Sequence, residues 1–189
     1  MKILIACEFS GVVRDEFIKL GHDAMSCDIL PTEKSGPHYQ GNLLDILSDG
    51  WDLIIAHPPC TYLANSGVRW LHTDPSRWSL LDDSCKFFKA ILDSNIPKIC
   101  IENPIPHKYA VERIGQKYTQ IIHPWEHGHG ESKATCLWLK GLKLLTPSDI
   151  VEGREQRVWK LPPSKNRWKE RSRTYPGIAK AMATQWGEY

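Results

Sequence analysis

The chain has 189 residues, of which 41% are hydrophobic, and 24 Lys and Arg face 22 Asp and Glu for a net charge of +2. This length predicts one domain with a full core, and the composition excludes collagen-like, coiled-coil and disordered proteins. No apolar run approaches the roughly 18–20 residues that cross a bilayer, and Glu8 comes too early for a secretory signal. We therefore expect a cytoplasmic protein without membrane contacts, whose six scattered cysteines are free and mostly buried thiols.

Short apolar runs alternate along the chain with segments of helical periodicity. We expect strands, or in one case a short strand or turn, at 2–7, 23–29, 41–46, 51–56, 98–101, 118–122 and 135–139. We expect helices at 12–20, 78–92, 109–114 and 178–186.

This alternation predicts an α/β fold, with an open, mostly parallel sheet and helices on both faces. Ligands in such sheets bind beyond the carboxyl ends of the strands, where the strand order reverses. Four polar clusters directly follow predicted strands, at 8–11, 28, 58–60 and 102–104. We expect these clusters to converge on one site.

The low net charge hides a basic segment. Residues 154–173 contain eight Lys and Arg but two Glu, a net charge of +6, which leaves −4 for the rest of the chain. Trp159 and Trp168 lie among these cations. Cations interleaved with flat aromatic rings suit a nucleic-acid backbone and its bases, and the alternative is a solvated loop.

The first polar cluster is a turn between a strand and a helix, Glu8-Phe9-Ser10-Gly11-Val12. Gly11 allows a sharp turn and the close approach of a ligand. Asp28, which ends the next predicted strand, has the position of an acid that binds ribose hydroxyls. A nucleoside-containing cofactor fits this pair of features, although an ordinary strand–helix turn has the same pattern.

The other two clusters carry reactive groups. Two prolines hold Cys60 outward at a strand end, where a stabilised thiolate acts as a nucleophile; the alternative is a small buried hydrophobic residue. Glu102 follows an apolar run, so its carboxyl must be paired or protonated, and a raised pKa would suit proton donation to a ring nitrogen. The alternative for Glu102 is a carboxylate that is hydrogen-bonded to the following loop.

Pro58-Pro59-Cys60, Asn65-Ser66-Gly67 and Glu102-Asn103-Pro104 together resemble motifs of the cytosine-C5 DNA methyltransferase family. Phe9-Ser10-Gly11 is similar to the cofactor turn of that family. The likeness is greatest to short, phage-type members that lack a full target-recognition domain, and it runs in order from Cys7 to Trp186.

The resemblance implies a Rossmann-like S-adenosylmethionine-dependent methyltransferase fold and methylation of cytosine C5 in DNA. It implies that Cys60 attacks C6, that Glu102 contacts N3 and the exocyclic amine, and that Lys133 takes the place of a family Arg. The residues assigned to the cofactor are Glu8, Phe9, Ser10, Gly11, Val12, Asp28, Ile29, Asn42, Leu43 and Pro58. Those assigned to the substrate are Pro59, Asn65, Ser66, Asn103, Lys165, Arg167, Trp168 and Lys169. Protection of phage DNA from restriction is the implied biological role.

The sequence departs from the family pattern in several places. The second glycine of the cofactor turn is Val13, and Asn42 replaces an acid expected near the adenine. Thr61 and Pro104 replace a Gln and a Val. The single domain, residues 1–189, leaves only a reduced basic recognition segment at about 140–175. Two alternatives therefore stay open: the same scaffold acting on a free cytidine nucleotide or with another one-carbon group, and a non-catalytic DNA-binding protein.

One further cluster, His123, His127, His129 and Cys136, contains metal-ligand residue types. Its spacing matches no strong zinc template, so we predict no metal site.

Overall fold

The structure is a computed structural model, and it describes residues 1–188. The strands are β1 (Lys2–Ala6), β2 (Asp23–Asp28), β3 (His38–Gln40), β4 (Leu53–Ala56), β5 (Lys98–Pro104), β6 (Gln120–Ile122) and β7 (Thr135–Lys140). The helices are α1 (Val12–Lys19), α2 (Arg69–Thr73), α3 (Arg77–Leu92), α4 (Lys108–Ile114), α5 (Arg157–Lys160), α6 (Arg167–Ser172) and α7 (Pro176–Trp186). Single 3₁₀ turns lie at Leu43–Asp45, Asn65–Gly67 and Pro124–Glu126.

The seven strands form one sheet in the order β3-β2-β1-β4-β5-β7-β6. β1 to β5 pair in parallel, and β7 runs antiparallel to both β5 and β6. The strand order reverses between β1 and β4, which is where ligands bind in open sheets of this kind. This arrangement confirms the predicted Rossmann-like methyltransferase fold.

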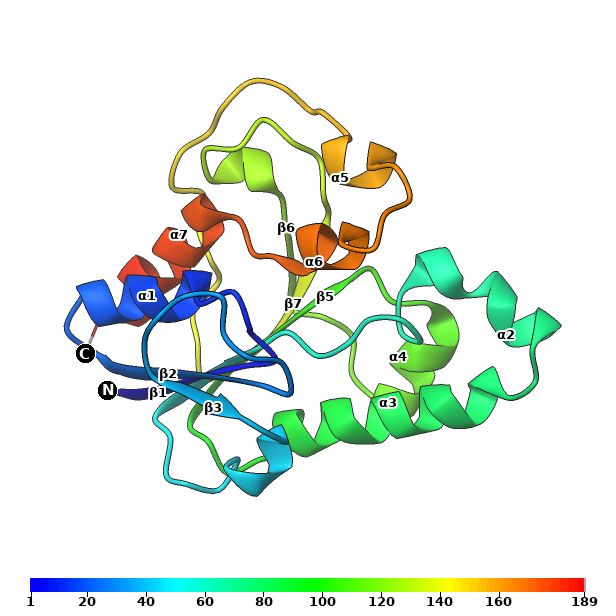
Figure 1. The fold of residues 1–189 in the computed structure, drawn as a ribbon, viewed down its shortest axis with the longest axis horizontal. Coiled ribbons are helices and arrows are strands. Elements are labelled where there is room, and N and C mark those ends of the chain that lie inside the picture. Colours follow the sequence, from blue (N-terminus) through cyan, green and yellow to red (C-terminus); the bar gives the residue numbers. More distant parts are fainter. Residues whose placement is uncertain (189) are drawn as a thin grey trace.

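Helices cover both faces of the sheet (Figure 1). Alternate residues of β1 serve the two cores: Leu4 packs with α3 and α4 on one face, and Ile5 packs with α1 and α7 on the other. Both side chains are fully buried. Period-two alternation in a strand with two covered faces produces the continuous apolar runs that the sequence shows. No helix within residues 1–188 is long and apolar enough to cross a membrane.

One sequence prediction is settled by the structure, and another needs correction. The strand or turn expected at 41–46 is a turn, the 3₁₀ turn Leu43–Asp45, which Asn42 caps by accepting a hydrogen bond from the Leu44 amide at 3.1 Å; β3 lies before it. β5 also extends past Ile101 through Glu102, because β7 pairs with it as far as Pro104. Proline is tolerated there because it ends the strand.

A second layer of structure lies above the sheet (Figure 1). Residues 123–132 and 148–157 pair there through two isolated bridges, His127 with Asp149 and Glu131 with Glu155. The sequence did not predict α5 and α6, which follow these residues and contain much of the basic segment.

A buried arginine holds the loop after β2 in place. Arg14 is fully buried, and its guanidinium pairs with Asp15 at 2.8 Å and donates to the carbonyls of Lys34 and Ser35. Gly36 has φ +146°, and a Cβ there would lie 2.8 Å from the guanidinium carbon. The arginine therefore fills the space that the glycine leaves.

We predict that Arg14→Met lowers the free energy of unfolding by about 3 kcal/mol or more, since several carbonyls and Asp15 lose their partner. Urea unfolding measures this change, and amide exchange at 29–37 should accelerate. Arg69→Met is the matched control: Arg69 is exposed, and its loss should cost under about 1 kcal/mol. Equal stabilities of the two variants would contradict the role of Arg14.

Candidate active site

The parallel register brings three strand ends to one level. Ala6 of β1 pairs with Ala56 of β4, which pairs with Ile101 of β5. The residues that follow directly are Cys7, His57 and Glu102, so they lie side by side at the carboxyl edge of the sheet. Three of the four predicted polar clusters therefore converge, and the fourth, Asp28, ends the neighbouring strand β2.

Hydrogen bonds tie the Cys60 loop to the end of β5. The Asn103 side-chain amide, which is buried, donates to the Pro58 carbonyl at 2.9 Å. The Asn65 amide donates to the Ile105 carbonyl at 2.8 Å. Because both ends of the loop are fixed to the strand that carries Glu102, the thiol and the carboxyl occupy one site.

Cys60 is half-buried, less exposed than the sequence predicted. Burial raises the pKa of its thiol, while the positive charges of Lys133 and Arg171 lower it. The net effect is a pKa above the ordinary range, so the free protein holds a thiol beside the cations that would stabilise a thiolate.

Glu102 pairs with a histidine that the sequence analysis did not consider. Its Oε2 lies 3.1 Å from Nδ1 of His57, and the Thr174 hydroxyl donates to the same oxygen at 3.4 Å. Burial raises the pKa of Glu102, but the hydrogen bond and charge of His57 outweigh burial and hold that pKa below its usual value. Of the two states expected for Glu102, paired or protonated, the structure shows the pair, and the raised pKa that would suit proton donation is not found.

Lys133 lies just before β7 and reaches the same site. Its ammonium donates to the Arg171 carbonyl at 3.0 Å and lies 5.8 Å from the Tyr175 ring centre. Its charge lowers the pKa of both Cys60 and Glu102. Three residues predicted to be catalytic are thus within electrostatic reach of one another.

The β1–α1 turn has its carboxylate turned inward. Glu8 is buried, and it accepts hydrogen bonds from the amides of Val13 at 2.7 Å and Arg14 at 3.3 Å and from the Ser10 hydroxyl at 3.2 Å. It therefore caps the N-terminus of α1 in place of a conventional N-cap residue. Gly11 makes the turn with φ +70°.

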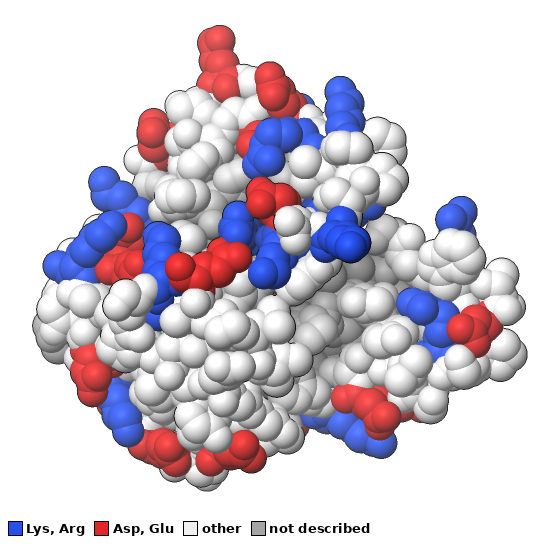
Figure 2. Space-filling view, in the orientation of Figure 1, with Lys and Arg blue, Asp and Glu red and all other residues white. Residues whose placement is uncertain are grey.

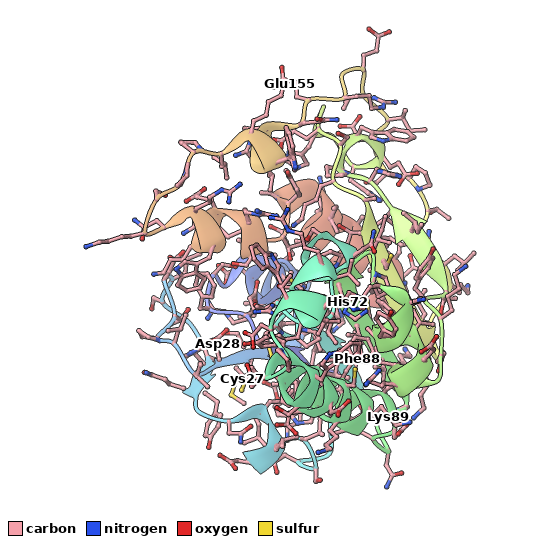
Figure 3. The ribbon with its side chains drawn as sticks, turned by 90° about the vertical axis from the view of Figure 1, so that its right-hand side faces the viewer. Cys27, Asp28, His72, Phe88, Lys89 and Glu155 are labelled. Atoms are coloured by element: carbon pink, nitrogen blue, oxygen red, sulfur yellow. The ribbon has the colours of Figure 1, made fainter. Side chains whose placement is uncertain are left out.

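The remaining residues assigned to the cofactor differ in exposure. Asp28 is half-buried, and its Oδ1 accepts from the Leu30 amide at 2.9 Å; burial raises the pKa of this carboxyl. Figure 3 shows Asp28 beside Cys27 in the body of the molecule, with Glu155 far above in the second layer. Ile29 is 76% exposed. The others are Phe9, Leu43 and Pro58, which are buried, Val12, which is half-buried, and Asn42, which is exposed.

Apart from the buried Asn103, the residues assigned to the substrate belong to two segments of the chain. Pro59, Asn65 and Ser66 are exposed on the loop after β4. Lys165, Arg167, Trp168 and Lys169 lie in and before α6. Figure 2 shows Lys and Arg side chains gathered over α6, along the upper rim of the hollow between α6 and the helices α2 and α4.

The segment 167–174 lies over the β1–α1 turn. The ring centres of Trp168 and Phe9 are 5.8 Å apart, and Arg173 and Lys169 both pair with Glu33, at 2.6 and 3.8 Å. A cavity of about 40 Å³ remains between residues 7–10, His57 and residues 172–174. Pockets for drug-sized ligands measure about 300–1,000 Å³, so this cavity is too small to hold a nucleoside-sized ligand.

The histidine cluster considered for zinc is used in packing. His127 Nδ1 lies 2.9 Å from the Ser148 hydroxyl, and His129 Nε2 accepts from the Gly177 amide at 3.0 Å. His123 stacks on Trp125. Cys136 is buried in β7, in the core that α3 and α4 cover. Within residues 1–188 no group of three or more His, Cys, Asp or Glu has a metal-binding arrangement.

His57, Thr174 and Arg14 are the residues that sequence reasoning missed. The signal for His57 was its place directly before Pro58, since the register of three parallel strands puts that position next to Glu102. Thr174 comes from the other end of the chain, and no pattern in the sequence links it to Glu102.

No family model and no curated protein matches the sequence. Among solved structures, the methyltransferase EhMeth of Entamoeba histolytica is similar, with a TM-score of 0.48 and 17% sequence identity. The similarity covers 87% of this chain and 60% of EhMeth, so the chain spans about three fifths of that protein. A likeness at this level carries no functional argument, and the fold assignment rests on the sheet order.

We predict that Glu33→Gln loosens the segment 167–174 and leaves the global fold intact. Two exposed ion pairs contribute about 0.2–1 kcal/mol each, so trypsin should cleave at residues 165–173 about three to five times faster. Mass spectrometry of early cleavage products measures this rate. Glu16→Gln, which removes a surface pair with Lys19 on α1, is the control and should leave cleavage there unchanged.

Proposed function

We propose that this protein transfers a methyl group from S-adenosylmethionine to C5 of cytosine in DNA, through a covalent bond between the Cys60 sulfur and C6. One observation carries the proposal: a thiol, a paired carboxylate and an ammonium group meet at the carboxyl edge of a methyltransferase-type sheet. The resemblance of the surrounding motifs to the cytosine-C5 family supports it.

The chemistry requires these groups. C5 of cytosine is a poor nucleophile until a thiolate adds to C6, which makes the ring an enamine. Lys133 and Arg171 favour the thiolate of Cys60, whose own proton leaves to solvent. Glu102 meets N3 of the ring, where negative charge develops on addition, and a proton delivered there lowers the barrier.

S-adenosylmethionine supplies an electrophilic methyl group. The residues that would hold it are the turn at 8–12, Asp28 and Pro58, which lie at the strand-order reversal. The fit is incomplete in the closed arrangement, because the cavity of about 40 Å³ is small. Displacement of residues 172–174, which form one wall of that cavity, would enlarge it.

DNA is the proposed partner because α6, which belongs to the basic segment, lies along the hollow between α6 and the helices α2 and α4 (Figure 2). Trp159 is 71% exposed and Trp168 50% exposed, so both offer ring faces to bases. A cytosine in a duplex must leave the helical stack to reach Cys60. With residues 140–175 alone for recognition, backbone contacts should outnumber base contacts.

We predict that DNA containing 5-fluorocytosine traps a stable adduct with the wild-type protein in the presence of S-adenosylmethionine, since the fluorine at C5 blocks elimination. Cys60→Ser should form none. Denaturing electrophoresis and intact-mass spectrometry detect the adduct. Cys85→Ser is the matched control, because Cys85 is a buried thiol of the α3 core and should leave the adduct yield unchanged.

The same experiment separates the alternatives. An adduct with 5-fluorocytidine nucleotides but not with DNA would assign a nucleotide substrate. An adduct whose mass exceeds that of protein plus DNA by a one-carbon group other than methyl would assign that group. DNA binding without an adduct would leave a binding protein and overturn the proposal.

We further predict that replacing Lys165, Arg167 and Lys169 together by Ala weakens DNA binding and flattens its dependence on salt. Each lost phosphate contact lowers the slope of log K against log salt by about 0.9 for duplex DNA, so a change of about 2–3 is expected. Fluorescence anisotropy over a salt series measures the slope. The triple replacement of Lys19, Lys86 and Lys180, exposed on other helices, should leave the slope nearly unchanged.

A further inference from the structure

One imidazole at the strand ends is left half-satisfied. His57 has 11% of its side chain exposed, and its Nδ1 lies 3.1 Å from Oε2 of Glu102. Its Nε2 is buried and has no hydrogen-bond partner among residues 1–188. An unpartnered buried nitrogen costs about 1–3 kcal/mol, so a purely structural histidine would be expected to use both nitrogens.

The unpartnered nitrogen belongs to a ring that borders the small cavity at the cofactor turn. That cavity is lined by Cys7, Glu8, Phe9, Ser10, His57, Ser172, Arg173 and Thr174. The imidazole of His57 therefore lies between two parts of the site. Its Nδ1 contacts Glu102, the carboxylate assigned to the cytosine substrate, and the imidazole also lines the cavity beside the turn assigned to the cofactor.

The geometry points to His57 as a positioning residue that fixes Glu102 and supplies the proton that Glu102 delivers to N3 of cytosine. This inference rests on the proposed function. It assigns the source of a proton that the ionised Glu102 does not hold by itself.

The step balances as follows. The His57 imidazolium gives its Nδ1 proton to Glu102, which becomes a neutral acid beside a neutral imidazole. As the Cys60 thiolate forms the S–C6 bond, the C5=C6 pair moves to C4–C5 and the C4=N3 pair moves onto N3, which takes the proton from Glu102. After C5 has taken the methyl group, N3 returns its proton to Glu102 and the imidazolium forms again. C5 then loses its own proton to solvent, and the C5–H electron pair re-forms C5=C6 as the S–C6 bond breaks and releases the Cys60 thiolate.

The charges around His57 favour this role. Burial lowers the pKa of the imidazole, but the hydrogen bond and charge of Glu102, helped by Glu8, outweigh burial and hold that pKa above its ordinary value; Lys133 opposes them. The titratable and charged groups that surround the ring are Cys7 and Glu8 after β1, Asp28 at the end of β2, Glu102 on β5, Lys133 before β7 and Arg173 after α6.

The pH dependence has a defined sign. The donor is the protonated imidazole and the nucleophile is the Cys60 thiolate, whose pKa is also raised. The rate of adduct formation should therefore stop rising with pH at the pKa of His57 and decline above the pKa of Cys60. Asparagine keeps an N–H donor near the position of Nδ1 but holds no transferable proton. His57→Asn therefore preserves the contact to Glu102 and removes the proton source.

The test measures the rate of adduct formation on 5-fluorocytosine DNA with S-adenosylmethionine from pH 6 to 10. General acid catalysis contributes about 10²–10⁴-fold, so His57→Asn should form the adduct at least about 100-fold more slowly at pH 7. The alkaline decline of the wild type should be absent from the variant. His22→Asn is the matched control, because this buried histidine lies directly before β2, at the amino ends of the strands, and it should keep the wild-type profile.

A second measurement does not depend on activity. Histidine-labelled protein without DNA should show by NMR an imidazole that titrates above the ordinary histidine range, and Glu102→Gln should move that titration to lower pH. An unchanged titration in Glu102→Gln, or a His57→Asn rate profile equal to that of the wild type, overturns the role of His57. If the wild type forms no adduct at any pH while Glu102→Gln still lowers the pKa of the His57 imidazole, the proposed function is overturned and the donor role with it.

Discussion

The alignment of β1, β4 and β5 is the constraint on which the candidate site depends. Three parallel strands end in register, so the side chains that follow them have fixed neighbours before any loop is considered. A carboxylate at such a place is costly unless it is paired, and His57 is the residue that the register puts beside Glu102. This pair also interacts electrostatically with its neighbours: the charge of Glu102 acts on Cys60, and the charge of Lys133 acts on both His57 and Glu102.

The distribution of charge follows from this geometry. The body of the chain is acidic, and several contacts hold the basic segment and the residue after it against this body. They are ion pairs to Glu33, a hydrogen bond from Thr174 to Glu102, and a hydrogen bond from Lys133 to the Arg171 carbonyl. These contacts are individually weak, because most of them are exposed. The segment is therefore held by several small contributions, in contrast to the loop after β2, which one buried arginine fixes.

Much of this structure was predictable from the sequence, and the limits are physical. Buried strands and long amphipathic helices are encoded locally, so β1, β4, α1 and α3 lie within a few residues of their predicted ranges. The direction of β7 and the length of β5 depend on pairing between distant segments, which local patterns do not encode. The same limit applies to charge: the pKa of Glu102 depends on a partner 45 residues away in sequence, so the isolated motif left a paired and a protonated carboxyl equally open.

The segment 167–174 contacts both Phe9 in the β1–α1 turn and Glu33 in the loop after β2. In an enzyme with a separate recognition module, the surface that holds a polyanion changes without affecting access to the catalytic pocket. Under the proposed function, Trp168, Lys169 and Arg173 would contribute to both tasks, because they contact Phe9 and Glu33 and belong to the basic segment. A substitution selected for different binding of an anionic partner would then also change the contacts that cover the cavity, so the two properties would evolve together.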